Sequence, residues 1–239
     1  MVEYSSKVDD QLYVWKRKLL KRGSLAKRLT KKGQVKINSL IPEKVHLVIS
    51  DSIKAMVKTT LLGSNITTNR QQAVGRNLYE RDELLKKKLS TYRKTAVVEG
   101  AGTGAGGIFM GMADFPLLLS IKMKFLFEAA TIYGFDTNEY EERLFILHVF
   151  QLAFSSDEKR KETFRVIEDW EKQKLVLKDM DWKVFQQEYR DYIDLVKMFQ
   201  LIPGFGAVVG AYANYNLLDH LGETAMNCYR LRIVANGEN

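Results

Sequence analysis

The glycine-rich block that begins at Gly100 contains the residue types of a phosphate-binding loop. Residues 102–107 satisfy the G-x-G-x-x-G pattern of dinucleotide-binding proteins, and Glu128 follows about 20 residues onward, where a ribose-binding acid is expected. The context does not support this chemistry, because Asp114 and Pro116 interrupt the helix that should follow the loop. The chain also lacks the alternating strands and helices that build a parallel sheet. We therefore expect no nucleotide cofactor.

The remaining groups that could bind metal or act as nucleophiles are few and scattered. His46, His148 and His220 have no partner at the spacing of a metal site, so the sequence predicts no metal. Cys228 is the single cysteine of the chain and cannot form an internal disulfide, which favours a reducing compartment. We expect Cys228 to be a small residue of the core.

Residues 4 to 22 predict a basic amphipathic helix. A tryptophan in the apolar stripe and cations on the opposite face are typical of helices that lie on anionic membranes. A helix docked on its own domain has the same pattern, so both interpretations stay open. Membrane contact would use Trp15, Arg17, Lys18 and Lys21. The stripe itself consists of Tyr4, Val8, Leu12, Trp15 and Leu19, with Lys7 among the opposing cations.

Positive charge is concentrated in the first part of the chain. Residues 1–95 hold 22 Lys and Arg against 8 Asp and Glu, a net of +14, whereas the other 144 residues have a net of −6. An anionic membrane surface or lipid fits this balance. Nucleic acid fits it less well, because exposed aromatics and known nucleic-acid motifs are missing. No signal peptide is visible. We expect a cytoplasmic protein, peripheral to the inner face of the plasma membrane, that binds no nucleic acid.

Helical spacing runs through nearly the whole chain. Pro42 opens a helix that should end near Gly63, and Asn77 can cap a charged helix through Tyr92. Residues 140–154 are apolar enough to be buried, and residues 157–197 carry aromatic side chains at helical intervals. These patterns predict an all-α protein with one compact multi-helix domain over residues 1–239, in which residues 1–35 form the basic amphipathic segment.

Two glycine-rich segments, residues 100–113 and 198–218, carry no charge. Both contain the Gly-xxx-Gly spacing that lets helices approach closely, so we expect them to pack together. In that arrangement Gly102 or Gly106 would face Gly206 or Gly210. Insertion into a membrane is the alternative, although Pro203 and several amide side chains make a spanning helix costly.

With these residues in view, the chain resembles the EcsC family of bacterial proteins, and the resemblance covers most of its length. The supporting motifs are the block from Glu99 to Pro116, Glu128 with residues 133–136, residues 202–210 followed by Asn214, and the segment from Leu221 to Arg232.

The resemblance implies an α-helical protein, hydrophobic in places, that is associated with the Ecs-type ABC transporter system and has no established reaction. No catalytic residues can therefore be carried over. Asp114 is expected to cap the following helix, with a proton-transfer or ligand role as the alternative. The motif positions are structural or line a lipid-facing groove: Gly102, Gly106, Asp114, Pro116, Glu128, Pro203, Gly206, Gly210, Asn214 and Arg232.

Two classes of function follow from these observations. The first is a peripheral membrane or lipid-interacting accessory protein, acting with ABC transporter subunits and anchored by its basic N-terminal helix. The second is a soluble enzyme of unknown reaction with a pocket around Asp114, Glu128 and Arg232. A closed polar pocket would favour the enzyme, and an exposed apolar groove would favour the lipid-interacting protein.

Overall fold

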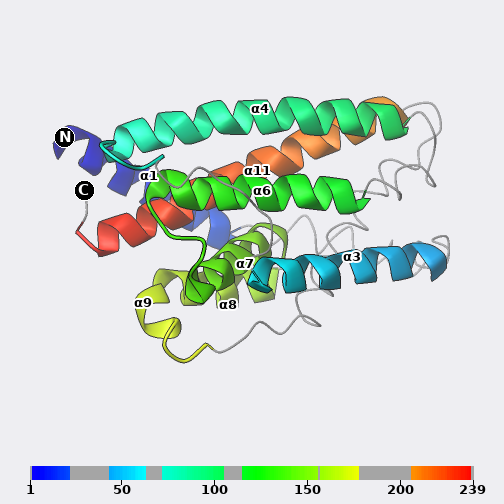
Figure 1. The fold of residues 1–239 in the computed structure, drawn as a ribbon. Coiled ribbons are helices and arrows are strands. Elements are labelled where there is room, and N and C mark those ends of the chain that lie inside the picture. Colours follow the sequence, from blue (N-terminus) through cyan, green and yellow to red (C-terminus); the bar gives the residue numbers. More distant parts are fainter. Residues whose placement is uncertain are drawn as a thin grey trace.

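Every regular element that the structure describes is an α-helix (Figure 1). The computed structural model describes residues 2–21, 43–62, 72–104, 115–155, 157–177 and 206–237. Within these ranges it leaves undescribed the side chains of residues 2–3, 43–46, 48–49, 97–104, 115, 157 and 206–214. The all-α prediction is confirmed. The helices are α1 (Val2–Lys21), α3 (Glu43–Leu62), α4 (Leu78–Gly104), α6 (Phe115–Tyr133), α7 (Tyr140–Phe154), α8 (Asp157–Glu168), α9 (Trp170–Gln173) and α11 (Gly206–Ala235).

The pair α4 and α11 forms the most extensive helix–helix contact, and α6 lies beside both (Figure 1). Close approach is possible because Gly222 of α11 has no side chain. A Cβ atom at that position would lie 2.8 Å from Cδ1 of Leu89 and closer still to Cδ2. Real Cβ atoms essentially never approach so near, so the missing side chain sets the spacing of the two helices here.

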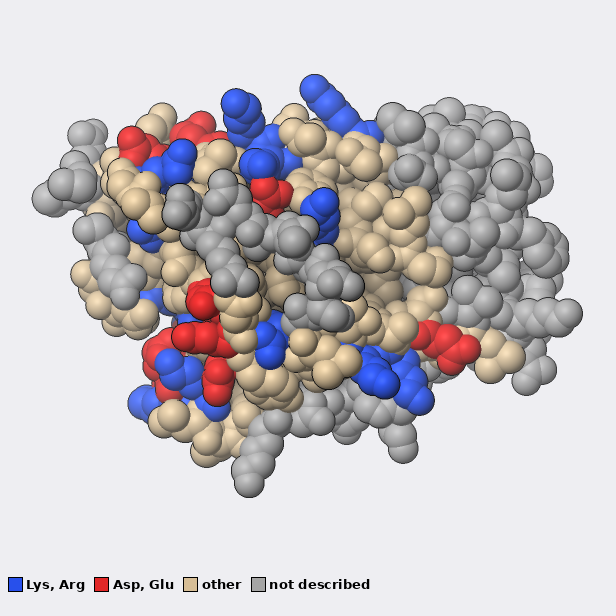
Figure 2. All heavy atoms as spheres, in the orientation of Figure 1, with Lys and Arg blue, Asp and Glu red and all other residues tan. Residues whose placement is uncertain are grey.

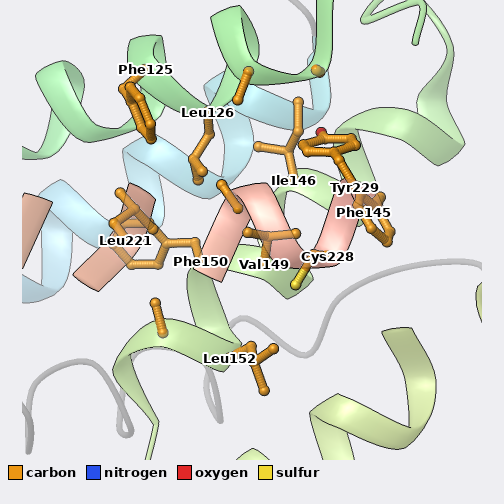
Figure 3. Close-up of a cluster of buried hydrophobic side chains, with 14 of the residues drawn as sticks. Phe125, Leu126, Phe145, Ile146, Val149, Phe150, Leu152, Leu221, Cys228 and Tyr229 are labelled. Atoms are coloured by element: carbon orange, nitrogen blue, oxygen red, sulfur yellow. The ribbon is translucent and has the colours of Figure 1, made fainter. Parts of the chain in front are cut away.

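The core of the protein is built around α7, which is buried along most of its length. Figure 3 shows Phe145 of α7 beside Tyr229 of α11 and Phe150 of α7 beside Leu221 of α11, with Phe125 of α6 above them. The expectation that residues 140–154 are buried is confirmed, as is the core position of Cys228, which is fully buried. Desolvation in this setting raises the pKa of the Cys228 thiol, so the thiol stays protonated and unreactive.

The ends of α4 and α6 show how local sequence sets helix boundaries. The Asn77 side chain accepts a hydrogen bond from the Glu80 amide at 3.0 Å, and the Glu80 carboxylate accepts one from the Asn77 amide at 2.9 Å. The cap by Asn77 is confirmed, and the reciprocal contact of Glu80 completes a capping box that was not anticipated. The predicted end at Tyr92 is wrong, because α4 continues to Gly104 along α11. Gly134, with φ of +95°, ends α6 in a conformation that favours glycine.

The expected packing of the two glycine-rich segments can be followed only in part. Gly102 lies in α4, and Gly206 and Gly210 lie in α11, so the helices that carry them are neighbours. Which glycines face one another stays a prediction, and Gly106 lies outside the described residues. Within the described ranges, no helix combines the length and the apolar character needed to cross a membrane.

Candidate functional site

The apolar stripe of α1 faces the protein interior. Trp15 is only 6% exposed, and its ring meets that of Phe164 edge-on, with 5.9 Å between the centroids. Of the two interpretations, α1 is therefore the helix docked on its own domain. Trp15 does not act as a membrane anchor, because its side chain is buried. An indole in the core has no apolar surface left to offer a bilayer. Val8, Leu12 and Leu19 are buried with it.

Polar contacts hold α1 in this position. The Tyr4 hydroxyl donates to Asp82 at 2.6 Å, and Gln11 accepts a hydrogen bond from Arg230 at 3.0 Å. Lys16 pairs with Glu168 of α8, and Lys18 lies 3.7 Å from Glu223 of α11. The helix is thus fixed to the bundle along both halves of its length.

The outward face of α1 combines exposed apolar and aromatic surface with positive charge. Tyr13 is 62% exposed and Val14 is 63% exposed. The Arg17 guanidinium lies over the Tyr13 ring, 5.6 Å from its centroid, and Lys18 and Lys21 are exposed on the following turn. We call these five residues the α1 face. The sequence analysis named its three cations but missed Tyr13 and Val14. These two residues could have been identified because they lie among the charged residues and outside the apolar stripe.

A groove of about 590 Å³ lies between α3 and α6. Figure 2 shows this side of the molecule, where tan surface separates the charged side chains over the two helices. Among the described residues, Pro116 is the one member of the predicted motif set that lines the groove, and the other lining residues were not anticipated. They are Asp51, Ser52, Ala55, Met56, Thr59 and Thr60 of α3 with Leu119, Ser120, Met123 and Lys124 of α6.

A buried ion pair ties together four helices at the other end of the bundle. Asp82 is fully buried and accepts hydrogen bonds from Arg230 at 3.0 and 2.8 Å. Tyr4 and Tyr133 also donate to this carboxylate. Burial and the neighbouring Asp82 raise the pKa of Tyr133 well above its usual value, so the phenol remains a donor. Sequence reasoning missed this cluster.

A second buried cluster surrounds Arg232, which the sequence singled out as a motif position and as a member of the alternative enzyme pocket. Its guanidinium donates to Glu142 at 2.6 Å and lies between the rings of Phe135 and Phe145, 3.8 and 4.3 Å from their centroids. The Tyr229 hydroxyl donates to the same carboxylate at 2.8 Å. Desolvation raises the pKa of Glu142 despite this pairing. The guanidinium is enclosed by a salt bridge and two rings, as expected of a structural group.

Glu128 belongs to a third set of contacts, with α4. It accepts a hydrogen bond from Tyr92 at 2.8 Å and pairs with Lys88 at 2.5 Å. Glu128 and Arg232 therefore have separate partners, and the structure does not bring them into one pocket. Asp114, Pro203 and the side chain of Asn214 lie outside the described part of the molecule.

Lys122 of α6 is a buried cation without a carboxylate partner among the described residues. It is 4% exposed, and its ammonium donates to the Leu118 carbonyl at 3.4 Å. Desolvation lowers its pKa to about 8. A lysine inside a helical bundle is costly unless it is paired, so this position is a weak point of the described core.

Comparison with known proteins places the chain among bacterial relatives. The model of the EcsC protein family matches residues 6–234. The chain is 56% identical over 220 residues to "Protein EcsC" of Bacillus subtilis (strain 168), covering 92% of each sequence. It is 31% identical over 157 residues to "Uncharacterized protein YdbA" of the same organism, covering 64% of this chain and 58% of that protein. No solved structure matches. The chain belongs to the EcsC family.

Proposed function

We propose that this protein is a peripheral membrane protein whose α1 face binds an anionic lipid surface. The observation that carries the proposal is the exposure of Tyr13 and Val14 beside Arg17, Lys18 and Lys21 on a helix that stays docked. The contact surface is therefore the face of α1 opposite to its buried apolar stripe.

The chemistry of the α1 face suits a bilayer interface. Tyrosine prefers the head-group region, where its ring lies against apolar atoms while its hydroxyl stays hydrated. Each nearby Lys or Arg contributes about 1 kcal/mol to association with an anionic surface. Lys18 also lies near Glu223, so its charge is partly offset, and Arg17 and Lys21 should contribute more.

The proposal includes an accessory role at the cytoplasmic face of the plasma membrane, where ABC transporter subunits would be the protein partners. Support for that partner comes from what the resemblance to the EcsC family, set out above, implies. Attachment through α1 alone would leave the α3–α6 side available, because the groove is lined by other helices.

Vesicle co-sedimentation tests the proposal. The wild-type protein should sediment with vesicles of phosphatidylglycerol and phosphatidylcholine but not with phosphatidylcholine alone. The combined substitutions Tyr13→Ser, Val14→Ser, Arg17→Glu and Lys21→Glu should weaken binding by about tenfold or more, because they remove the apolar contact and reverse two charges. Salt should weaken wild-type binding as well.

Lys87→Glu combined with Lys94→Glu is the matched control, since both lysines are exposed on α4 and the change in net charge is the same. This control should retain most of the binding. Equal losses in the two variants would show that only net charge matters and would overturn the assignment to α1. If the wild-type protein does not sediment with the anionic vesicles, the proposal of membrane binding through α1 is also overturned.

A further inference from the structure

We infer that the groove between α3 and α6 binds the alkyl chain of a single-chain anionic amphiphile, with a fatty-acid carboxylate as the head group at Lys124. The inference goes beyond surface association through α1, and either proposal can fail without the other. Nothing in the family match assigns a ligand to these residues.

The size and shape of the groove suit one extended chain. Its volume of about 590 Å³ lies within the range of small-molecule pockets, which is about 300–1,000 Å³. The lining of α3 extends from Asp51 to Thr60, which corresponds to about 14 Å at ~1.5 Å per residue. Two neighbouring helices form its walls, so the groove is elongated along their axes.

The floor of the groove is mainly apolar and adaptable, with Thr60 as its buried polar member. Met56, Leu119 and Met123 are buried, and Ala55 and Pro116 complete the apolar lining. Unbranched methionine side chains adjust to flexible apolar ligands. The Ser120 hydroxyl donates to the Pro116 carbonyl at 2.8 Å, so its hydrogen-bonding capacity is partly used within α6. An alkyl chain needs no further polar partners along this floor.

Charge at the two ends of the groove gives the ligand a direction. Lys124 lies toward one end and forms no ion pair with a described acid, so its ammonium is available to an anionic head group. Helices α3 and α6 run in the same direction, which places Asp51 toward the Pro116 end (Figure 1). Asp51 would repel a carboxylate there. The head group should therefore lie at Lys124 and the chain should extend toward Pro116.

A competition titration tests the inference with the full-length protein. Fluorescent cis-parinaric acid should bind saturably, and palmitate should displace it better than hexadecanol or hexadecylamine. Ala55→Phe should raise the dissociation constant of palmitate by about tenfold or more, because the ring occupies the groove. Lys124→Glu should raise it about tenfold for palmitate and leave that of hexadecanol unchanged within about twofold.

Two matched variants control for general effects. Ala235→Phe adds the same ring at an exposed position near the end of α11, and Lys94→Glu reverses an exposed charge on α4. Both should bind palmitate as the wild type does. Since Ala55 and Lys124 are exposed, thermal unfolding should confirm that their variants remain folded.

The inference is overturned if the wild type shows no saturable binding, if hexadecylamine competes as well as palmitate, or if Ala55→Phe has no effect. Vesicle co-sedimentation separates the two proposals. Ala55→Phe should sediment with phosphatidylglycerol vesicles like the wild type, whereas the α1-face variant should still bind palmitate.

Discussion

The two ends of α6 lie in opposite kinds of surroundings. At its C-terminal end, Tyr133 joins a network in which Asp82 and Arg230 are buried and paired. In its N-terminal half, Lys122 is buried without a described acid and Lys124 borders an open groove. The difference indicates that the charges at the first end hold helices together, whereas the two lysines of the second have no carboxylate partner among the described residues.

Breaking the paired end should have the largest effect. Arg230→Ala leaves the fully buried Asp82 carboxylate without its cation, which should lower the free energy of unfolding by about 3–5 kcal/mol. Urea denaturation measures this loss. Arg93→Ala is the comparison, because the Asp219 partner of Arg93 is 54% exposed and the loss should stay near about 1 kcal/mol. Equal losses would mean that burial does not distinguish the two pairs.

Removing the unpaired charge of Lys122 should stabilise the protein, in contrast to the loss of Arg230. Lys122→Met should raise the free energy of unfolding at pH 7 by up to about 3 kcal/mol, because the folded state no longer holds a desolvated ammonium. The pKa of Lys122 is lowered from 10.5 to about 8 on folding, so the unfolded chain binds the extra proton between these values. The free energy of unfolding of the wild type therefore rises, through Lys122, as the pH increases from about 8 to 10.5.

Denaturation at pH 7 and near pH 10.5 checks the sign of the Lys122 effect. The advantage of the methionine variant should shrink as the pH rises, since the lysine of the folded wild type is then neutral and no charged ammonium is buried. A methionine variant that is less stable than the wild type at pH 7 would show that Lys122 has a stabilising partner. It would contradict the contrast between paired charges at one end of α6 and unpaired charges at the other.

A substitution at the contact between α4 and α11 is expected to change the free energy of unfolding by a smaller amount. Gly222→Ala should lower the free energy of unfolding by about 1–3 kcal/mol, because the new methyl group displaces the Leu89 side chain. Glu223→Ala, at the exposed neighbouring position, should change it by about 0.5 kcal/mol or less. Thermal melts of both variants provide the measurement. A neutral Gly222→Ala would mean that Leu89 moves aside freely.

Much of the helical architecture follows from local patterns. The apolar run at residues 140–154 matches α7, and Asn77 with Glu80 supplies the cap of α4. The end of α4 was not predictable, because glycines disfavour helix locally and only the neighbouring α11 explains why the helix continues to Gly104. Tertiary packing outweighs propensity at that point.

The candidate sites were harder to predict from the sequence. The sequence pattern separates the two faces of α1 but does not say which face meets the protein, so docking and membrane contact through Trp15 both stayed open until the structure showed Trp15 buried. The groove joins residues 51–60 to residues 116–124, and Asp82 lies 148 positions before Arg230. No local pattern relates segments so far apart, because their proximity depends on how the helices pack.

A label on the α1 face tests the central claim most directly. An environment-sensitive fluorophore can be attached to a Val14→Cys variant, because the native Cys228 is fully buried and its thiol remains protonated. Emission should shift to the blue when phosphatidylglycerol vesicles are added, and the same label on a Lys87→Cys variant should not respond. A response at Lys87→Cys alone, or at neither position while the protein sediments with the vesicles, would contradict membrane contact through α1.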